Sequence, residues 1–317
     1  MTKKSKQIIF PVKIALILIF PSIFLFLFFN LWPIAYSISL AFTNANNINI
    51  FNPKAENPLR FIGLENFYKL FHDVGFYYSL YKTLLFVATS VPLKLAVGVM
   101  LAFLFTSPLI AGKKIMRGLL LAPWALPVIM SIMVWRGLFD PSSGPVAGFF
   151  AAITGRDFSI YRQEWDAYLA YNIVEMWLAY PFIMTVTLGA ITGVPREVIE
   201  ASLIDGAGWW ARFRHIILPQ ISRPLWFATI LTSGASLQAF LVPMLLNDGG
   251  PVKIVSTFVG KAFVRVNDML MLFGYHRAFM DGEYGYAAAF YLIVVLILGV
   301  YMYVWFRVSG MYKGVGE

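Results

Sequence analysis

The stretch PREVIEASLIDGAGWWARFRHIILP, from Pro195 to Pro219, is the most polar segment of an otherwise apolar chain. It lies between two long apolar runs and carries Glu-Ala-Ser near its start, Asp-Gly-Ala in its middle and Ile-Leu-Pro at its end. Pro195 suits the first turn of a helix, and Gly206 and Gly208 allow a sharp change of direction after Asp205. The pattern predicts two short helices in an L shape, the second ending before Pro219, where a partner can dock.

The composition is that of an integral membrane protein. Of the 317 residues, 59% are hydrophobic and only 13% are charged, whereas soluble domains contain about 25% charged residues. The chain has no cysteine, which excludes disulfides and thiolate chemistry. Its net charge of +9 comes from basic residues at the edges of apolar runs, a pattern typical of topology signals rather than of nucleic-acid binding.

Apolar runs predict six membrane-spanning helices within a transmembrane domain over residues 14–310. The predicted spans cover residues 14–40, 84–105, 118–135, 167–191, 225–242 and 286–306. Pro33 predicts a bend in the first span, Pro123 and Pro127 predict a kinked or broken third span, and Pro181 interrupts the fourth. Residues 63–71 predict a short interfacial helix, 136–166 a loop, and 244–285 a partly helical excursion.

The charges favour one orientation in the membrane. If the N-terminus is inside, the inner segments hold 13 Lys and Arg against 4 acidic residues, whereas the outer segments hold 11 of each. The inner loops are short and dense in basic residues, which favours the cytoplasmic side. We therefore expect residues 1–13, the polar stretch 195–219 and the tail 311–317 to be cytoplasmic.

The polar stretch resembles the coupling motif of permease subunits of ATP-binding-cassette (ABC) importers. That motif is Glu-Ala-Ala, three residues, Gly, nine residues and Ile-x-Leu-Pro, and it is matched at Glu200, Ala201, Gly206, Ile216, Leu218 and Pro219. Ser202 stands where the family usually has its second Ala. Asp205-Gly206-Ala207 is similar to the variant in carbohydrate importers, such as the permeases for maltose and glycerol 3-phosphate.

Further segments follow the family's order along the chain. They are FIGLENF at 61–67, KTLLFVATSVPLKL at 82–95, LLLAPWALP at 119–127, WLAYPF at 177–182, GGP at 249–251 and GYAAA at 285–289. Between Thr257 and Tyr275 the chain is longer than the family's usual spacing. The resemblance implies an all-α type I ABC importer permease fold, with six transmembrane helices and a cytoplasmic L-shaped coupling helix pair, in the cell (plasma or inner) membrane.

The resemblance also implies partners and a function. The partners are a second permease subunit, two copies of a cytoplasmic ATPase, an extracytoplasmic solute-binding protein and a sugar or oligosaccharide substrate, besides membrane lipid. The residues implied in contact with the ATPase are Glu200, Ala201, Ser202, Asp205, Gly206, Ala207, Leu218 and Pro219. The sequence has no G-x-x-x-x-G-K-[ST] motif, so we expect ATP and Mg²⁺ in the partner ATPase, and no cofactor, metal or catalytic residue in this transport subunit.

Lys94 and Glu175 lie inside predicted spans, where an unpaired charge costs several kcal/mol. Either they pair with each other and fix the packing of two spans, or Lys94 faces a vestibule or reaches the membrane surface. Small polar residues at helical spacing, with aromatic residues nearby, suggest a sugar site, although such residues also serve as helix-packing contacts. The substrate-pathway candidates are Trp177, Tyr180, Thr232, Ser233, Ser236, Phe240, Glu175 and Lys94, and Thr229 shares their face on the fifth span.

Two other classes of function remain open from the sequence. An ion-coupled secondary transporter would need no ATPase and would use Glu175 and Lys94 as its relay. A membrane-embedded enzyme would need a catalytic set, and no such set is visible. His72, His215 and His276 are isolated in the sequence, which predicts interfacial or surface positions for them.

Overall fold

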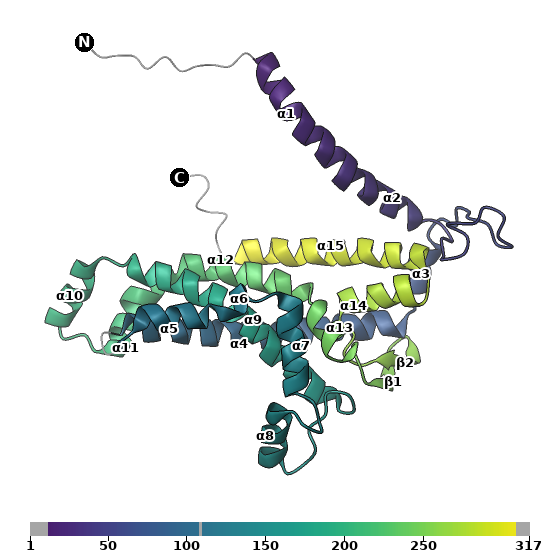
Figure 1. Cartoon of the computed structure of the whole chain (residues 1–317). Coiled ribbons are helices and arrows are strands. Elements are labelled where there is room, and N and C mark those ends of the chain that lie inside the picture. Colours follow the sequence, from purple (N-terminus) through teal and green to yellow (C-terminus); the bar gives the residue numbers. More distant parts are fainter. Residues whose placement is uncertain (1–11, 108–109, 309–317) are drawn as a thin grey trace. The chain divides into compact units, whose positions relative to one another are not determined.

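The structure is a computed structural model that describes residues 12–107 and 110–308 (Figure 1). The predicted tail 311–317, and all but the last two residues of the predicted N-terminal segment 1–13, lie outside the described residues. The chain divides into two compact units. One comprises Met1–Leu70 with Arg277–Leu292, and the other Phe71–His276 with Ile293–Glu317.

The first unit begins with a helical span built of α1 (Val12–Phe26), the π-turn η1 (Leu27–Leu31) and α2 (Trp32–Leu40). Residues Leu16–Leu40 are long and apolar enough to cross a membrane. The π-turn lies directly before Pro33, which has no N–H to bond the preceding turn, and a widened turn absorbs that loss. Pro33 therefore changes the winding of the span without ending it.

The same unit holds short polar contacts around α3 (Glu65–Phe71), the predicted interfacial helix. The Asn66 side-chain amide donates to the carbonyls of Ala41 at 2.9 Å and Thr43 at 2.8 Å. Gly285, at the start of α15 (Tyr284–Val308), donates its N–H to the Ala45 carbonyl at 2.8 Å. A Cβ at Gly285 would lie 2.2 Å from the Thr43 carbonyl oxygen, so this close approach requires glycine.

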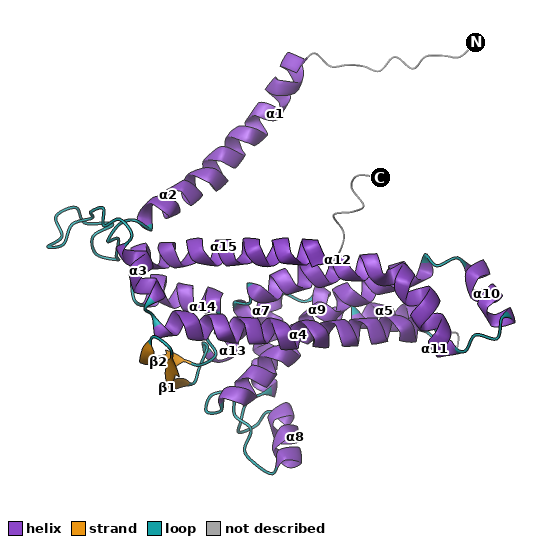
Figure 2. Ribbon diagram, turned by 180° about the vertical axis from the view of Figure 1, so that it is seen from behind, coloured by secondary structure: helices purple, strands orange, loops and turns teal. Residues whose placement is uncertain are grey.

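The second unit is organised around three long helices that lie side by side (Figures 1 and 2). They are α4 (Val74–Thr106), α9 (Glu164–Thr192) and α12 (Leu218–Leu237). Helix α9 remains continuous through Pro181, so the expected interruption of this span does not occur. Lys82 of α4 contacts Glu164 of α9, and Lys94 contacts Glu175 further along both helices. Helices α4 and α9 are therefore parallel.

The third predicted span is broken at its two prolines, as the sequence predicts. It consists of α5 (Lys113–Leu120), α6 (Ala122–Ala125) and α7 (Val128–Leu138). Pro123 lies in the first turn of α6 and Pro127 directly precedes α7. The hydroxyl of Tyr180 on α9 donates to the Leu120 carbonyl at 2.8 Å, which satisfies a backbone group that the break leaves free.

Among the described residues, four helices are long and apolar enough to cross a membrane. The count rises to five if α11 to α12 and α13 (Leu241–Asn247), which meet at a bend of 43°, form one span. The broken segment between Lys113 and Leu138 contains no single helix of spanning length. The count of six spans stays a prediction.

The connecting segments 136–166 and 244–285 both contain more regular secondary structure than the sequence predicts. The predicted loop 136–166 contains the ten-residue helix α8 (Pro145–Thr154). Before it, Asp140 accepts bonds from the hydroxyls and amides of Ser142 and Ser143, and these bonds lower the pKa of the Asp140 carboxyl to about 2.

The segment 244–285 differs from an all-α fold. After α13 it forms an antiparallel hairpin of β1 (Val252–Thr257) and β2 (Gly260–Arg265), then α14 (Leu270–Tyr275) and the π-turn η3 (His276–Met280). Residues 252–265 are rich in Val, Ile, Thr and Phe, with Gly260 between the two runs, which is a strand signal that the reading of this segment as partly helical missed. The remaining elements are α10 (Arg196–Ile204), α11 (Trp209–Arg212) and the π-turn η2 (Phe213–Ile217).

Helices α4 and α9 come unusually close at Gly98. A Cβ there would lie 2.5 Å from Ile183 Cβ and 3.1 Å from the Met184 backbone nitrogen. In contrast, no atom lies within 4 Å of a Cβ built on Gly189. Tertiary packing thus requires a residue without a side chain at position 98 but not at position 189.

We predict that Gly98→Ala lowers the free energy of unfolding by about 1–3 kcal/mol, because the added methyl forces α4 and α9 apart. Gly189→Ala is the matched control and should be neutral or slightly stabilising, because alanine favours a helix over glycine. Thermal unfolding of the detergent-solubilised protein measures both. Equal melting temperatures for the two variants would contradict the close approach.

Candidate functional site

The polar stretch folds as two helical segments joined by a tight turn at Gly206. Gly206 has φ of +73°, its N–H bonds the Leu203 carbonyl, and the Ala207 N–H bonds the Ser202 carbonyl at 2.9 Å. These two bonds form a Schellman motif that ends α10. The predicted change of direction at Gly206 is confirmed.

The second helical segment does not end before Pro219, contrary to the prediction. Residues Trp209–Leu237 run through α11, η2 and α12 without a break, and Pro219 lies in the first turn of α12. A π-turn precedes this proline as one precedes Pro33, and it again absorbs the missing N–H. The polar stretch is therefore joined directly to the fifth predicted span.

The side chains of this stretch are mostly exposed. Glu200, Ala201 and Asp205 are exposed, whereas Ser202 is buried and its hydroxyl donates to the Ile199 carbonyl. Ala207 and Leu218 are half-buried, and Gly206 and Pro219 are exposed. Large apolar side chains are also exposed here, namely Leu203, Ile204 (87%), Trp209 and Trp210. Such a patch among charged residues is typical of a protein contact surface.

Aromatic contacts connect this stretch to α4. Phe213 stacks on Trp209 with ring centroids 5.6 Å apart, packs tilted on Trp210 at 5.4 Å, and packs edge-on against Phe103 at 5.3 Å. Phe103 lies one turn before the end of α4. A displacement of α11 would thus be transmitted to α4 through the packed rings and to α12 through the continuous backbone.

A second cluster lies inside the bundle, where α4, α9 and α12 meet. The Lys94 ammonium donates to Glu175 Oε2 at 2.8 Å and to Ser236 Oγ at 2.9 Å. Lys94 is 1% exposed, and the Glu175 side chain is 19% exposed. The pairing of Lys94 with Glu175, one of the two sequence alternatives, is the one that the structure has.

The other pathway candidates are not part of this cluster. Trp177 packs edge-on against Trp135 at 5.9 Å and lines a recess of about 290 Å³ with residues of α7. The Tyr180 hydroxyl donates to the Leu120 carbonyl, and the Ser233 hydroxyl donates to the Ile230 carbonyl of its own helix. Thr232 is buried, and its carbonyl accepts the Ser236 hydroxyl at 2.9 Å.

Phe240 lies off the helix that was expected to carry it. Helix α12 ends at Leu237, and Phe240 stands at the bend before α13. There its ring packs edge-on against Tyr275 with centroids 5.3 Å apart. The polar face of α12 therefore does not extend to Phe240.

Sequence reasoning missed a second buried ion pair on the same two helices. Lys82 is 1% exposed, donates to Glu164 Oε1 at 2.7 Å, and has its ammonium 4.3 Å from the centre of the Trp165 ring. Glu164 Oε2 also accepts Lys253 of β1 at 3.1 Å. A signal was present, because the two lysines are spaced along one helix almost as the two glutamates are along the other.

His276 is buried between two carboxylates, so the expected surface position is wrong. Its Nδ1 lies 3.0 Å from Asp268 Oδ2 and its Nε2 lies 2.9 Å from Asp248 Oδ1. Both nitrogens can donate only in the imidazolium. Burial lowers the pKa of His276, but the two carboxylates outweigh it and raise this pKa above its usual value. Burial also raises the pKa of Asp268.

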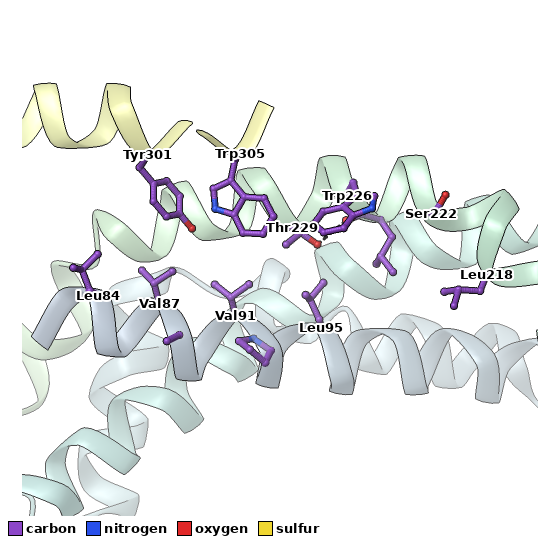
Figure 3. A pocket seen from close by; sticks show the side chains of 13 residues that line it. Leu84, Val87, Val91, Leu95, Leu218, Ser222, Trp226, Thr229, Tyr301 and Trp305 are labelled. Atoms are coloured by element: carbon purple, nitrogen blue, oxygen red, sulfur yellow. Dashed lines mark hydrogen bonds between the residues drawn. The ribbon is translucent and has the colours of Figure 1, made fainter. Parts of the chain in front are cut away.

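A cavity of about 790 Å³ lies between α4, α12 and α15 (Figure 3). Its walls are apolar, with Trp226, Tyr301 and Trp305 among the lining residues. The polar residues of α12 that line it are Ser222 and Thr229, whose hydroxyls donate to the Pro219 and Leu225 carbonyls of their own helix. The cavity offers no charged group to a polar ligand. Within residues 12–107 and 110–308, no group of three or more His, Asp or Glu side chains could hold a metal ion.

The sequence pattern of a transport family matches residues 94–309, which include the polar stretch 195–219 and the cluster of Lys94, Glu175 and Ser236. Its description is "binding-protein-dependent transport system inner membrane component". The chain belongs to this family. The chain is therefore a membrane-spanning transport component.

Two relatives of this transport component share its sequence over three quarters of the chain. Maltose/maltodextrin transport system permease protein MalF from Klebsiella aerogenes is 32% identical over 245 residues, 75% of this chain and 47% of that protein. The protein of the same name from Escherichia coli K12 is 32% identical over 244 residues, with the same coverage. The chain thus spans about half the length of the curated relatives that it matches.

Solved structures show the fold of this transport component. A bacterial ABC transporter involved in the import of the acidic polysaccharide alginate matches with a TM-score of 0.76 at 19% identity, over 96% of each chain. A structure of an alginate ABC transporter in complex with its alginate pentasaccharide-bound periplasmic protein matches with a TM-score of 0.72 at 18% identity, over 93% of each chain. The fold is that of an ABC importer permease.

We predict that Lys94→Met destabilises this transport component by about 3–5 kcal/mol, because it leaves the Glu175 carboxylate, which is only 19% exposed, without its cation. Lys94→Met combined with Glu175→Leu should recover most of that loss. Thermal unfolding in detergent measures both variants. Lys69→Met, which removes an exposed pair with Glu65, is the control and should change little. A double variant no more stable than the single one would contradict the pairing.

We predict that the segment 248–276 loses protection as the pH rises. Because the pKa of His276 is higher in the folded protein than in the unfolded chain, the stabilisation is complete below the unfolded pKa of about 6.5 and is lost as the pH rises through the folded pKa. Hydrogen exchange, corrected for its intrinsic pH dependence, measures this, with amides of α9 as the reference. His276→Gln should flatten the profile, and an unchanged profile in that variant would contradict the assignment.

Proposed function

We propose that this chain is one permease subunit of an ATP-driven, binding-protein-dependent importer, and that it forms half of the translocation pathway for a sugar or oligosaccharide. A second permease subunit would form the other half, two copies of a cytoplasmic ATPase would hold ATP and Mg²⁺, and an extracytoplasmic solute-binding protein would deliver the substrate. Membership of the family supports the binding-protein dependence. The maltose/maltodextrin permeases among the relatives support a carbohydrate.

The observation that carries the coupling role is the exposed tip of residues 200–210. Leu203, Ile204, Trp209 and Trp210 are apolar and exposed, and Glu200, on the same segment, is exposed as well. An apolar centre with a charge at its edge fits a protein groove with a basic group on its rim. We infer that Glu200 pairs with that group and that Gly206 shapes the bend. We propose that residues 195–219, and with them both termini, are cytoplasmic.

The second part of the proposal is a substrate contact at Glu175. Its Oε2 accepts Lys94, whereas no described residue donates to its Oε1. The carboxylate is partly exposed although its partner lysine is buried. A sugar hydroxyl can donate to a free carboxylate oxygen, and a charge-assisted bond of this kind is stronger than a neutral one. Lys94 and Ser236 then act by fixing the orientation of Glu175.

Force would reach this cluster through the two helices that leave the polar stretch. Helix α12 continues directly from α11, and Phe213 packs on the last turns of α4. Both helices contribute to the Lys94 cluster, through Ser236 and Lys94 themselves. Movement of the coupling stretch by the ATPase would therefore shift α4 and α12 around the substrate site, which is the change that alternating access requires.

The proposal is tested by uptake in vesicles that hold the complete transporter. We expect labelled maltodextrin uptake that requires ATP on the ATPase side and the solute-binding protein on the other side, and that survives collapse of ion gradients. Uptake that follows an ion gradient without ATP would instead favour a secondary transporter and would overturn the proposal.

We predict that Glu200→Ala lowers ATPase association and ATP-driven uptake at least about tenfold, because it removes the charge-assisted contact between Glu200 and the basic group of the ATPase. Glu197→Ala lies on the same helix, α10, and is the matched control. Co-purification of the ATPase and initial uptake rates measure both. Unchanged assembly and uptake in Glu200→Ala would refute the role of Glu200 and leave the class of transporter standing.

A further inference from the structure

The cavity between α4, α12 and α15 is lined along its length by apolar side chains (Figure 3). On the α4 side the lining residues include four at helical spacing of three and four, namely Leu84, Val87, Val91 and Leu95. The helix rises about 16 Å between the first and the last of them, and one leaflet supplies half of a hydrocarbon thickness of about 30 Å. The α4 wall is therefore as long as the hydrocarbon of one leaflet.

The hydroxyls in the cavity wall are already used within α12. Ser222 donates to the Pro219 carbonyl at 2.7 Å, and Thr229 donates to the Leu225 carbonyl at 2.7 Å. None of the described lining residues is charged. The cavity therefore favours a hydrocarbon chain over a sugar, because a sugar would lose its hydrogen bonds to water without replacing them.

Three aromatic residues of the wall add polar groups that have no acceptor. The ring of Trp305 lies 5.5 Å from that of Trp226 and 6.2 Å from that of Tyr301, measured between centroids. Within residues 12–107 and 110–308, no hydrogen bond is made by either indole N–H or by the Tyr301 hydroxyl. Donors of this kind need an acceptor inside a membrane. The expected occupant therefore combines a hydrocarbon chain with acceptor oxygens, as the ester end of a phospholipid does.

Positive charge lies to one side of the aromatic pair. In Figure 3 residue numbers rise along α15 in the direction in which they fall along α12, so the two helices are antiparallel. Arg223, three residues before Trp226, and Arg307, two residues after Trp305, are therefore displaced toward the same end of the bundle. Arg307 is held by the Tyr303 hydroxyl at 3.0 Å, whereas Arg223 is exposed and no described residue pairs with it.

No acidic residue of the two helices neutralises this charge. Helix α12 and helix α15 contain no Asp or Glu. Basic side chains between transmembrane helices attract anionic lipid headgroups, and a guanidinium donates two parallel hydrogen bonds to a phosphate. The charge therefore favours an anionic phospholipid over a zwitterionic one.

We propose that this cavity binds an anionic membrane phospholipid. One acyl chain fills the space between α4, α12 and α15, the ester oxygens accept from Trp226 and Trp305, and the phosphate pairs with Arg223. A transmembrane helix in the same place would leave the indole donors unpaired, because its backbone acceptors are used within the helix. The bound chain holds α15 against α12, the helix that continues from the polar stretch 195–219. The inference needs only the membrane-spanning fold and no particular transported solute.

The headgroup contact is tested by thermal unfolding of the full chain, purified with its partner subunits and stripped of lipid in detergent. Dioleoylphosphatidylglycerol should raise the melting temperature at lower concentration than dioleoylphosphatidylcholine, which has the same chains, and inorganic phosphate alone should have no effect. Arg223→Gln should weaken the response to phosphatidylglycerol about fivefold, the factor for one basic residue at a membrane surface. Lys114→Gln is the matched control, because Lys114 on α5 is exposed, is expected on the same side of the membrane and does not line the cavity.

The chain site is tested by filling the cavity. Ala88 lines it with a short, exposed side chain, so Ala88→Phe should leave the melting temperature without lipid unchanged and abolish the response to both lipids. Ala152→Phe, at an exposed alanine of α8 outside the cavity, should respond as the wild type does. Wild-type responses in both Arg223→Gln and Ala88→Phe, or an equal loss in Arg223→Gln and Lys114→Gln, would overturn the site.

A photoactivatable lipid locates the bound chain without any substitution. Phosphatidylglycerol with a diazirine on one acyl chain is added to the assembled wild-type transporter in nanodiscs, and the labelled peptides are identified by mass spectrometry. We expect labels concentrated in residues 84–95 and 301–305. Labels spread evenly over these and the exposed apolar residues Met130 and Val134 of α7 would indicate only general lipid contact. Absence of label from residues 84–95 would show that a protein helix covers the cavity, and either result would overturn the proposal.

Discussion

The buried ammonium of Lys94 is the constraint on which the second unit of this protein depends. A lysine deep in a bundle costs several kcal/mol unless a carboxylate and further acceptors surround it. Glu175 and Ser236 meet that requirement, and they come from two different helices. The one side chain therefore fixes how α4, α9 and α12 pack. The Lys94–Glu175 pair specifies that packing more than it stabilises the protein, because a buried ion pair adds little net stability compared with an apolar core.

The parallel pairing of α4 and α9 extends this constraint along the bundle. Lys82 with Glu164 repeats the arrangement of Lys94 with Glu175 near the other end of the same interface. At Gly98 a Cβ would lie 2.5 Å from Ile183 Cβ, so the two helices approach closely there. Charge pairs thus set the register of the two helices, and a glycine sets their separation.

Prolines in this chain allow some helices to continue and break others. Before Pro33 and Pro219 a π-turn absorbs the missing N–H and the helix continues, whereas Pro123 and Pro127 break a span into three pieces. In the broken span the side chain of Tyr180 supplies a donor to a freed carbonyl. The helix is continuous at Pro219, and this continuity joins the polar stretch to α12 as one mechanical element.

The sequence by itself determined the membrane setting, the broken third span, the turn at Gly206 and the family, since each depends on composition or on neighbours within a few residues. It left the partner of Lys94 open, because that choice depends on which helices meet. It missed Lys82 with Glu164 and the burial of His276, whose partners are distant in the chain or lie across a turn. The pairing of β1 with β2, as distinct from their strand-forming composition, and the continuity through Pro219 were decided only by tertiary structure: strand pairing requires a partner strand, and a proline's missing bond is tolerated only where the surrounding backbone can widen.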